Sequence, residues 1–231
     1  MRISFIRHAD PYYPDDSLTP AGHLEAQALA RHLAGMGVTE MYSSPRGRAR
    51  LTASYTAGLL NLPVTVEPWA NELDGLNTVE NRRPIWDYDG AILRSPEVLS
   101  NLNDWQSLPP FDHPRLDGHL QRIRAGSDDF LARQGFTRAG TVYTCEHPNR
   151  KHIAFFAHLG FGLAWLAHLL AIPLPLMWAG FYLHPSSVTT ILFEERSPGI
   201  AAPRILTLGD LSHLRLAGLP PSPAGLIANT E

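Results

Sequence analysis

The chain has 231 residues, 44% of them hydrophobic and 18% charged, which is the composition of an ordinary globular protein with one sizeable core. Its formal net charge is −3 and no stretch is dense in Lys or Arg, so a nucleic-acid-binding surface is not expected. The single cysteine, Cys145, excludes an intrachain disulfide, and the apolar N-terminal stretch is too short for a signal peptide or a membrane span. We therefore expect a cytoplasmic protein without membrane or nucleic-acid partners; the oligomeric state stays open.

The first part of the chain alternates strand and helix patterns. Residues 2–7 predict a short strand, and Thr19 followed by Pro20 is typical of a helix start, because Thr caps free amides and Pro suits the first helical position. A strand is predicted at 40–44 and a helix from about 45 to 60. A further short strand is predicted at 64–66.

The segment from about 76 to 150 breaks this rhythm. It carries several Pro and Asp residues and one convincing helix, at about 116–133. We interpret the segment as an inserted, cap-like lobe within a single domain that spans residues 1–231.

Regular structure resumes after this segment. Residues 153–157 form a continuous apolar run, typical of a strand buried on both faces of a parallel sheet. A buried helix is predicted at 163–172, strands at 188–193 and 204–208, and an irregular tail after about residue 216. The whole pattern predicts an α/β fold, a three-layer sandwich with a mostly parallel central sheet.

Three predicted strands end at residues suited to binding one anion. The first ends at Arg7 and His8, the second at the segment 43–48 (SSPRGR), and a later one at His158. In open α/β sheets, ligands bind outside the carboxyl ends of the strands. We therefore expect Arg7, His8, Arg48 and His158 to meet around one ligand.

These residue types suit phosphate chemistry. The planar guanidinium of arginine binds two phosphate oxygens, and a neutral imidazole is a good nucleophile near pH 7. Transfer to the imidazole also needs an acid that protonates the departing alkoxide. Glu72 is the candidate acid, and Asp74, Glu67 and Glu80 are the alternatives.

The motifs resemble the histidine phosphatase superfamily, in its phosphoglycerate-mutase-like branch. Residues 7–9 (RHA) are similar to its Arg-His-Gly signature, and residues 18–26 (LTPAGHLEA) to its usual helix start. The segments 43–53 (SSPRGRARLTA) and 156–160 (FAHLG) resemble its second-helix motif and its second catalytic histidine. The resemblance implies that His8 becomes phosphohistidine, that Arg7, Arg48 and His158 surround the phosphoryl group, and that Glu72 is the proton donor. It implies no cofactor and no metal ion.

Four positions depart from the family pattern. Ala9 replaces a glycine and adds a methyl group where the backbone approaches the phosphate, and Leu159 replaces the glycine after the second histidine. The spacing from Glu72 to its following glycine is one residue shorter than usual. Arg46 stands where leucine is usual and is an extra cation at the pocket rim. Leu159 also excludes the acid of the acid-phosphatase branch, which directly follows the second histidine.

The leading hypothesis is a metal-independent phosphomonoesterase that acts on a small phosphorylated metabolite. A mutase that returns the phosphoryl group to a second hydroxyl is the first alternative, and a non-catalytic phospho-ligand binding module is the second. A serine nucleophile at Ser43 or Ser44 is not expected because no Gly-x-Ser-x-Gly elbow is present, and no Walker or Rossmann glycine pattern supports a nucleotide cofactor. Cys145, His147 and His152 are too scattered to predict a metal site.

Two groups in the inserted segment leave alternatives open. The first is a group of aromatic residues, which has two interpretations. They line an apolar slot for the leaving group or, as is more common for such a pattern, they form the small core of the lobe itself; these residues are Trp69, Trp86, Tyr88 and Trp105. Arg82 and Arg83 either bind a second acidic group of the substrate or belong to a solvated loop.

Overall fold

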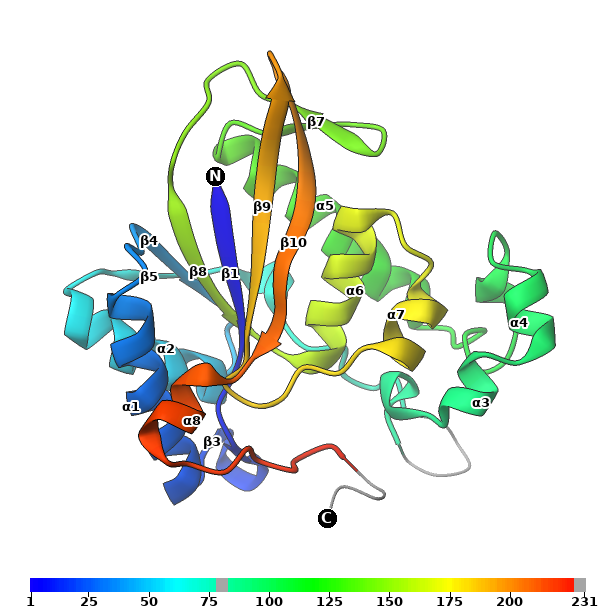
Figure 1. Cartoon of the computed structure of the whole chain (residues 1–231). Helices are drawn as coiled ribbons and strands as arrows, with labels where there is room; N and C mark the ends of the chain where they lie inside the picture. The colour runs from blue at the N-terminus through cyan, green and yellow to red at the C-terminus, as the bar shows by residue number, and fades with distance from the viewer. Residues whose placement is uncertain (78–82, 227–231) are drawn as a thin grey trace.

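The computed structural model describes residues 1–77 and 83–226 and has the predicted α/β architecture (Figure 1). The strands are β1 (Arg2–Arg7), β2 (Pro11–Tyr12), β3 (Ser17–Leu18), β4 (Glu40–Ser43), β5 (Val64–Val66), β6 (Thr137–Ala139), β7 (Val142–Thr144), β8 (His152–Ala157), β9 (Val188–Ser197) and β10 (Ile200–Asp210). The α-helices are α1 (Pro20–Ala34), α2 (Gly47–Leu60), α3 (Gly90–Leu93), α4 (Pro96–Ser100), α5 (Leu116–Arg133), α6 (Leu159–Leu170), α7 (Leu174–Gly180) and α8 (Ser212–Ala217). Short 3-10 helices are η1 (Tyr13–Asp15), η2 (Pro68–Ala70), η3 (Ile85–Asp87) and η4 (Trp105–Ser107).

One eight-stranded sheet runs through the molecule in the order β5-β4-β8-β1-β9-β10-β7-β6. The strands β5, β4, β8 and β1 are parallel to one another, whereas β9, β10, β7 and β6 join by antiparallel pairing. The parallel half carries the three strand ends that the sequence singled out, so their last residues meet at one edge of the sheet.

The central strands are buried on both faces, as the apolar run at 153–157 predicted. Along β8, Phe155 points into a core shared with α5 and α6, and Phe156 points into a second core shared with α1 and α2. The same alternation holds in β1 for Phe5 and Ile6. Strand side chains point to opposite faces in turn, so these residues hold both helix layers on the sheet.

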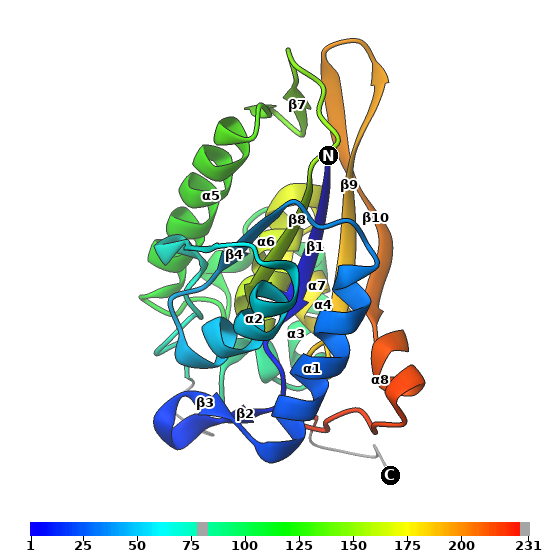
Figure 2. The same ribbon diagram turned by 90° about the vertical axis from the view of Figure 1, so that its left-hand side faces the viewer.

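The two helix layers are clear when the molecule is turned (Figure 2). Helices α1, α2 and α8 lie on one side of the sheet, where α1 packs against both α2 and α8. Helices α5, α6 and α7 cover the other side, with α6 between α5 and α7. The expected three layers are therefore present.

Most predicted elements lie within a few residues of their observed bounds. The helix at 116–133 has its predicted ends, and Thr19 caps α1 by accepting a hydrogen bond from the amide of Gly22 at 3.0 Å. Helix α6 begins at Leu159, four residues before the predicted start at 163, because its first amides are capped by a distant carboxylate.

The segment 76–150 contains more structure than its pattern indicated. Helices α3 and α4 are short and were not predicted, because their starts are fixed by the local caps of Asp89 and Ser95 and by packing of α3 on α7. Strands β6 and β7 extend the main sheet beside β10, and α5 belongs to the helix layer over α6.

Within the part of the chain that the structure describes, no helix combines the length and the apolar character needed to cross a membrane.

Candidate active site

The three strand ends converge as the sheet register requires. Arg7 pairs with Ala157 between β1 and β8, and Ser43 pairs with Phe156 between β4 and β8. The residues that directly follow these strands, which include His8 and His158, therefore lie side by side at the same edge of the sheet.

The imidazole rings of His8 and His158 are direct neighbours. Their centroids are 5.3 Å apart, and both rings are buried. Nδ1 of His8 lies 2.8 Å from the carbonyl oxygen of Ala9, which only accepts hydrogen bonds, so Nδ1 carries the proton and Nε2 keeps its lone pair. Nε2 of His158 lies 2.6 Å from the hydroxyl of Ser44.

The environment keeps both histidines neutral. Burial lowers the pKa of His8 well below its usual value, and the nearby positive charges of Arg7 and Arg48 lower it further. Burial likewise lowers the pKa of His158, with contributions from His8 and the same arginines. An uncharged imidazole is the form of histidine that can act as a nucleophile.

Arg7 is held rigidly beside the histidines. Its Nη1 donates to the carbonyl of Leu183 at 2.6 Å and to the hydroxyl of Tyr182 at 3.1 Å, and its Nη2 donates to the carbonyl of Ala224 at 3.2 Å. These partners are neutral oxygens, so the positive charge of Arg7 has no ion-pair partner among the described residues.

Arg48 lies in the first turn of α2 and is oriented by Asp16. One oxygen of the Asp16 carboxylate pairs with Nη1 of Arg48, and the other accepts the amide of Gly47 at 2.6 Å. The backbone of Asp16 approaches so closely that a Cβ on Gly47 would lie 2.4 Å from its carbonyl oxygen, so only glycine fits there. A charged group thus caps the N-terminus of α2 and aims a guanidinium at the cavity.

Glu72 reaches the same cavity from the segment after η2. Its Oε1 accepts hydrogen bonds from the amides of Leu73 at 3.0 Å and Phe161 at 2.7 Å, and its Oε2 accepts from the amide of Gly160 at 3.2 Å. It is therefore the carboxylate that caps α6. Burial raises the pKa of Glu72, although the three backbone donors and Arg48 oppose the shift. A raised pKa suits a group that must give up a proton near neutral pH.

A cavity of about 430 Å³ opens over these residues. Its wall is formed by Arg7, Tyr13, Arg46, Arg48, Glu72, Leu73, Asp74, Gly75, Asn77, Pro84, Trp86, Asp87, Leu159 and Gly225. The two histidines do not form part of this wall. They are buried behind its arginines, where 3% of His8 and none of His158 is exposed.

The alternative acids have other partners or lie elsewhere. Glu67 accepts from Trp69 at 2.8 Å and from Arg133 at 2.8 and 3.0 Å, away from the cavity. Asp74 lines the cavity but forms an ion pair with Arg46. Glu80 lies outside the described residues, as does Arg82.

Three of the four departures from the family pattern have clear places. The methyl group of Ala9 packs against Leu18 and Ala26, so this side chain points toward α1. Leu159 forms part of the cavity wall, and Arg46 stands at its rim, where its Nε also donates to Asn71 at 2.9 Å.

Two of the aromatic residues that the sequence offered for an apolar slot or for a small core of the lobe lie in different places. Trp69 packs in the main core against Phe130, Phe155 and Trp165. Trp86, in contrast, lines the cavity.

Sequence reasoning missed Asp16, Tyr182 and the role of Ser44. Asp16 and Arg48 are 32 positions apart and Arg7 and Tyr182 are 175 apart, and no spacing rule connects such pairs. Ser44 belongs to the motif at 43–53, but its hydrogen bond to His158 depends on the register of β4 and β8, which the motif does not reveal.

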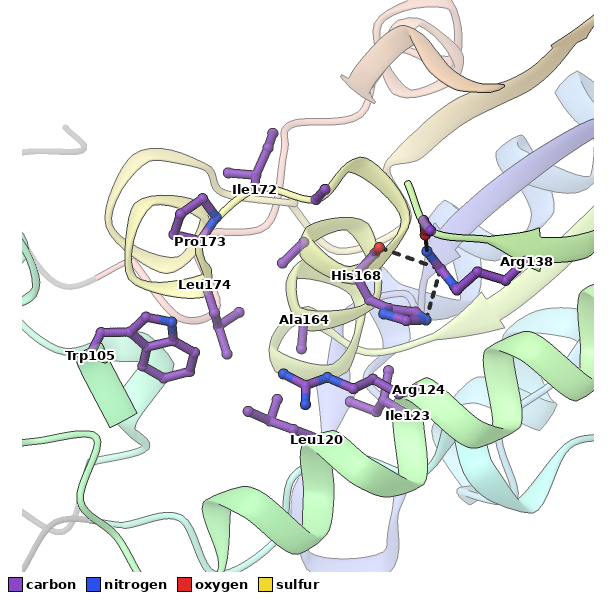
Figure 3. Close-up of a pocket in the computed structure, with 13 residues that line it drawn as sticks. Trp105, Leu120, Ile123, Arg124, Arg138, Ala164, His168, Ile172, Pro173 and Leu174 are labelled. Atoms are coloured by element: carbon purple, nitrogen blue, oxygen red, sulfur yellow. Dashed lines mark hydrogen bonds between the residues drawn. The ribbon is translucent and has the colours of Figure 1, made fainter. Parts of the chain in front are cut away.

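A second cluster of Arg and His lies near the C-terminal end of α6, in a hollow of about 460 Å³ between α5 and α6 (Figure 3). There Arg138 donates from Nη2 to Nε2 of His168 at 2.8 Å and from Nε to Asp128 at 2.7 Å, and Nη2 also contacts the hydroxyl of Tyr143. Its charge is already paired with a carboxylate.

In residues 1–77 and 83–226, no group of three His, Cys, Asp or Glu side chains is arranged to hold a metal ion. His152 instead bonds Ser4 at 2.9 Å and the carbonyl of Met36 at 2.9 Å, so it does not join Cys145 and His147.

Comparison with known families shows the family of the chain. The family model described as histidine phosphatase superfamily, branch 1, matches residues 3–205. The chain belongs to the histidine phosphatase superfamily. This membership confirms the resemblance drawn from the motifs, and the match covers the strands and helices that carry His8, Arg48 and His158.

Solved structures share the fold of this histidine phosphatase family member. A mutant of the phosphoserine phosphatase of Entamoeba histolytica in complex with phosphoserine superposes with a TM-score of 0.64 at 20% identity, covering 92% of this chain and 98% of that chain. The α-ribazole phosphatase of Shigella flexneri gives 0.61 at 22% identity, covering 91% and 96%. A mycobacterial glucosyl-3-phosphoglycerate phosphatase in complex with VO3 gives 0.62 at 19% identity, covering 90% and 98%.

One curated relative matches over a shorter stretch. A human protein described as serine dehydratase-like is 26% identical over 121 residues, which are 47% of this chain. The chain spans about a third (36%) of that relative's length.

Proposed function

We propose that this protein is a metal-independent phosphomonoesterase that hydrolyses a small phosphorylated metabolite through a phosphohistidine at His8. Family membership supports phosphoryl-transfer chemistry at this site, and the solved neighbours include phosphatases for phosphoserine, α-ribazole phosphate esters and glucosyl-3-phosphoglycerate by their printed names. The observation that carries the proposal is the juxtaposition of two neutral, buried imidazoles with two arginines at one edge of the sheet.

In the first step, Nε2 of His8 attacks phosphorus and the bond between phosphorus and the alcohol oxygen breaks. Arg7 and Arg48 neutralise charge on the non-bridging oxygens, and the neutral His158 donates a hydrogen bond to one of them. Positioning and charge stabilisation supply most of the rate in such transfers. Glu72, whose pKa burial raises, gives its proton to the departing alkoxide, so the alcohol leaves neutral.

In the second step, water attacks the phosphohistidine. The Glu72 carboxylate takes a proton from this water, the bond between phosphorus and Nε2 breaks, and inorganic phosphate leaves. Nδ1 of His8 keeps its proton throughout, because the carbonyl of Ala9 holds it.

Turnover of p-nitrophenyl phosphate in the presence of a chelator tests this proposal. We expect full activity with EDTA, and we expect kcat/KM to show no acid limb near pH 6.5, because the pKa of His8 lies well below that value. Activity that disappears with the chelator and returns with a divalent cation would contradict the metal-independent mechanism.

The same assay separates the alternatives. A mutase would hydrolyse little and would move phosphate between two hydroxyls of one product, and a binding module would bind vanadate without any turnover. Hydrolysis with stoichiometric release of phosphate supports the phosphomonoesterase.

A further inference from the structure

We propose that a second cavity, continuous with the catalytic one, binds the leaving group, and that it selects phosphomonoesters of alcohols that carry an apolar ring and an amino or hydroxyl donor. This inference rests on the proposed function and names its substrate class. It follows from the way that Trp86, Leu159 and Asp87 join the two cavities.

The second cavity, called here the annex, has a volume of about 510 Å³. It lies between η3, the first turns of α6 and the end of α7, and it is lined by Arg83, Trp86, Asp87, Tyr88, Asp89, Leu159, Leu163, Trp178, Ala179, Gly180, Phe181, Tyr182, Gly225 and Leu226. Four of these residues, Trp86, Asp87, Leu159 and Gly225, also line the catalytic cavity. The two cavities therefore meet at these four residues, and we infer that one substrate of moderate length occupies both.

Trp86 directs the leaving group from the catalytic acid toward the annex. Its indole packs on the backbone of α6, so close that a Cβ on Gly160 would lie 2.6 Å from the ring. The same hypothetical Cβ would lie 3.0 Å from Oε1 of Glu72. The indole and the proposed proton donor thus flank one glycine. An alkoxide that receives its proton from Glu72 has its carbon skeleton beside Trp86, at the entrance of the annex.

The walls of the annex are suited to an apolar ring. Trp86 and Trp178 face each other with centroids 6.4 Å apart at 53°, and Leu159 and Leu163 supply aliphatic surface from α6. Phe181 remains 40% exposed in this structure, although aromatic side chains of this size are usually covered. Filling the annex with a ring would remove this apolar surface from water.

Asp87 adds a polar requirement at the seam between the cavities. Its carboxylate has no hydrogen-bond or ion-pair partner among the described residues, whereas the neighbouring Asp89 is occupied as the cap of α3. Burial raises the pKa of Asp87, which Arg83 and Arg7 oppose. A hydroxyl or ammonium group on the substrate would satisfy this carboxylate.

Three alkyl esters test the annex without changing the leaving oxygen: propyl phosphate, 3-phenylpropyl phosphate and 2-amino-3-phenylpropyl phosphate. We expect kcat/KM of the wild type to rise on the order of 10- to 100-fold from the first to the second ester, which is the gain available from a fitted apolar pocket. We expect a further rise of about 10-fold for the amino ester, because its ammonium group pairs with Asp87.

Two variants assign these gains to their residues. Ala179→Phe places a ring into the annex from α7 and should remove most of the preference for the phenyl esters, while Ala125→Phe, on the exposed face of α5 outside both cavities, should retain it. Asp87→Asn should remove the extra preference for the amino ester, while Asp112→Asn at another exposed position should not.

Equal kcat/KM for propyl and phenylpropyl phosphate, or a preference that survives Ala179→Phe, would overturn the annex proposal while leaving the phosphatase intact. An unchanged amino preference in Asp87→Asn would overturn the role of Asp87. Absence of hydrolysis of all three esters and of p-nitrophenyl phosphate would instead overturn the proposed function on which the inference rests.

Discussion

Two clusters of arginine and histidine lie near opposite ends of α6, and they differ in what their charges already bind. At the sheet edge, Arg7 donates only to neutral oxygens, and His8 and His158 are neutral and adjacent. In the hollow between α5 and α6, Arg138 is paired with Asp128 and donates to His168 (Figure 3). Arg7 therefore has positive charge available for an anion, whereas Arg138 is already ion-paired with Asp128.

The comparison shows why residue type alone does not locate a phosphate site. Burying an ion pair costs desolvation free energy, and an arginine that is already paired with a carboxylate is less available to bind an anionic ligand. Arg48 is the intermediate case, because its Nη1 forms an ion pair with Asp16, which holds the guanidinium beside the cavity. Matched substitutions in the two clusters test this difference.

His8→Ala should abolish turnover, with a loss in kcat of about 10⁴-fold or more, because no other group takes the phosphoryl. His168→Ala, the matched change in the second cluster, should leave kcat within about 2-fold. Steady-state assays with p-nitrophenyl phosphate measure both. Comparable losses in the two variants would mean that the two clusters do not differ as described.

Arg48→Ala and Arg138→Ala should have opposite effects on activity and stability. Arg48→Ala should lower kcat/KM by about 10²- to 10³-fold, because one charge on the transferring group is lost. Arg138→Ala should keep activity but lower the free energy of unfolding by about 1 kcal/mol, because Asp128 loses its ion pair with Arg138 and keeps only its contact with His168. Urea denaturation and kinetics on the same samples give both values. A stable but inactive Arg138→Ala protein would contradict the assignment.

Glu72→Gln sharpens the account of the catalytic cluster itself. It keeps an oxygen acceptor for the α6 amides but has no acidic proton, so kcat for propyl phosphate should fall about 100-fold. The loss should be much smaller in the first step with p-nitrophenyl phosphate, whose leaving group needs little protonation. Pre-steady-state release of p-nitrophenol measures that step, and Asp74→Asn is the control. Equal losses of the first-step rate for both esters would exclude Glu72 as the proton donor.

Glu25, a buried carboxyl behind Arg7, should give the smallest effect. Burial raises its pKa to about 7, although it accepts the Asp10 amide at 2.9 Å. Because the folded-state pKa lies above the unfolded value, folding favours the protonated form, and the protein loses stability as pH rises from about 4.5 to 7. Glu25→Gln should therefore gain stability relative to the wild type by about 2 kcal/mol between pH 5 and pH 8. Thermal unfolding at the two pH values tests it, and a constant difference would contradict the raised pKa.

The sequence predicted the parts of the site that local patterns encode. Arg7 and His8 directly follow a strand, and Thr19 with Pro20 marks a helix start, so strand ends and caps could be placed before the structure was known. Contacts between distant segments could not be predicted in this way. The backbone of Asp16 is in the left-handed conformation, and its carboxylate contacts Arg48 and Gly47 from the loop that follows η1. The direction of the Ala9 methyl group depends on how α1 packs. The short helices α3 and α4 depend on local caps and on packing against α7, which periodicity does not reveal.

Direct detection of a phosphohistidine tests the central claim. The enzyme would be mixed with a radiolabelled phosphomonoester, quenched in denaturant at alkaline pH within milliseconds, and digested to map the label. The account predicts an acid-labile, alkali-stable phosphoryl group on His8 that forms and decays at rates compatible with kcat. Turnover without label on His8, or with label on a different residue, would contradict it.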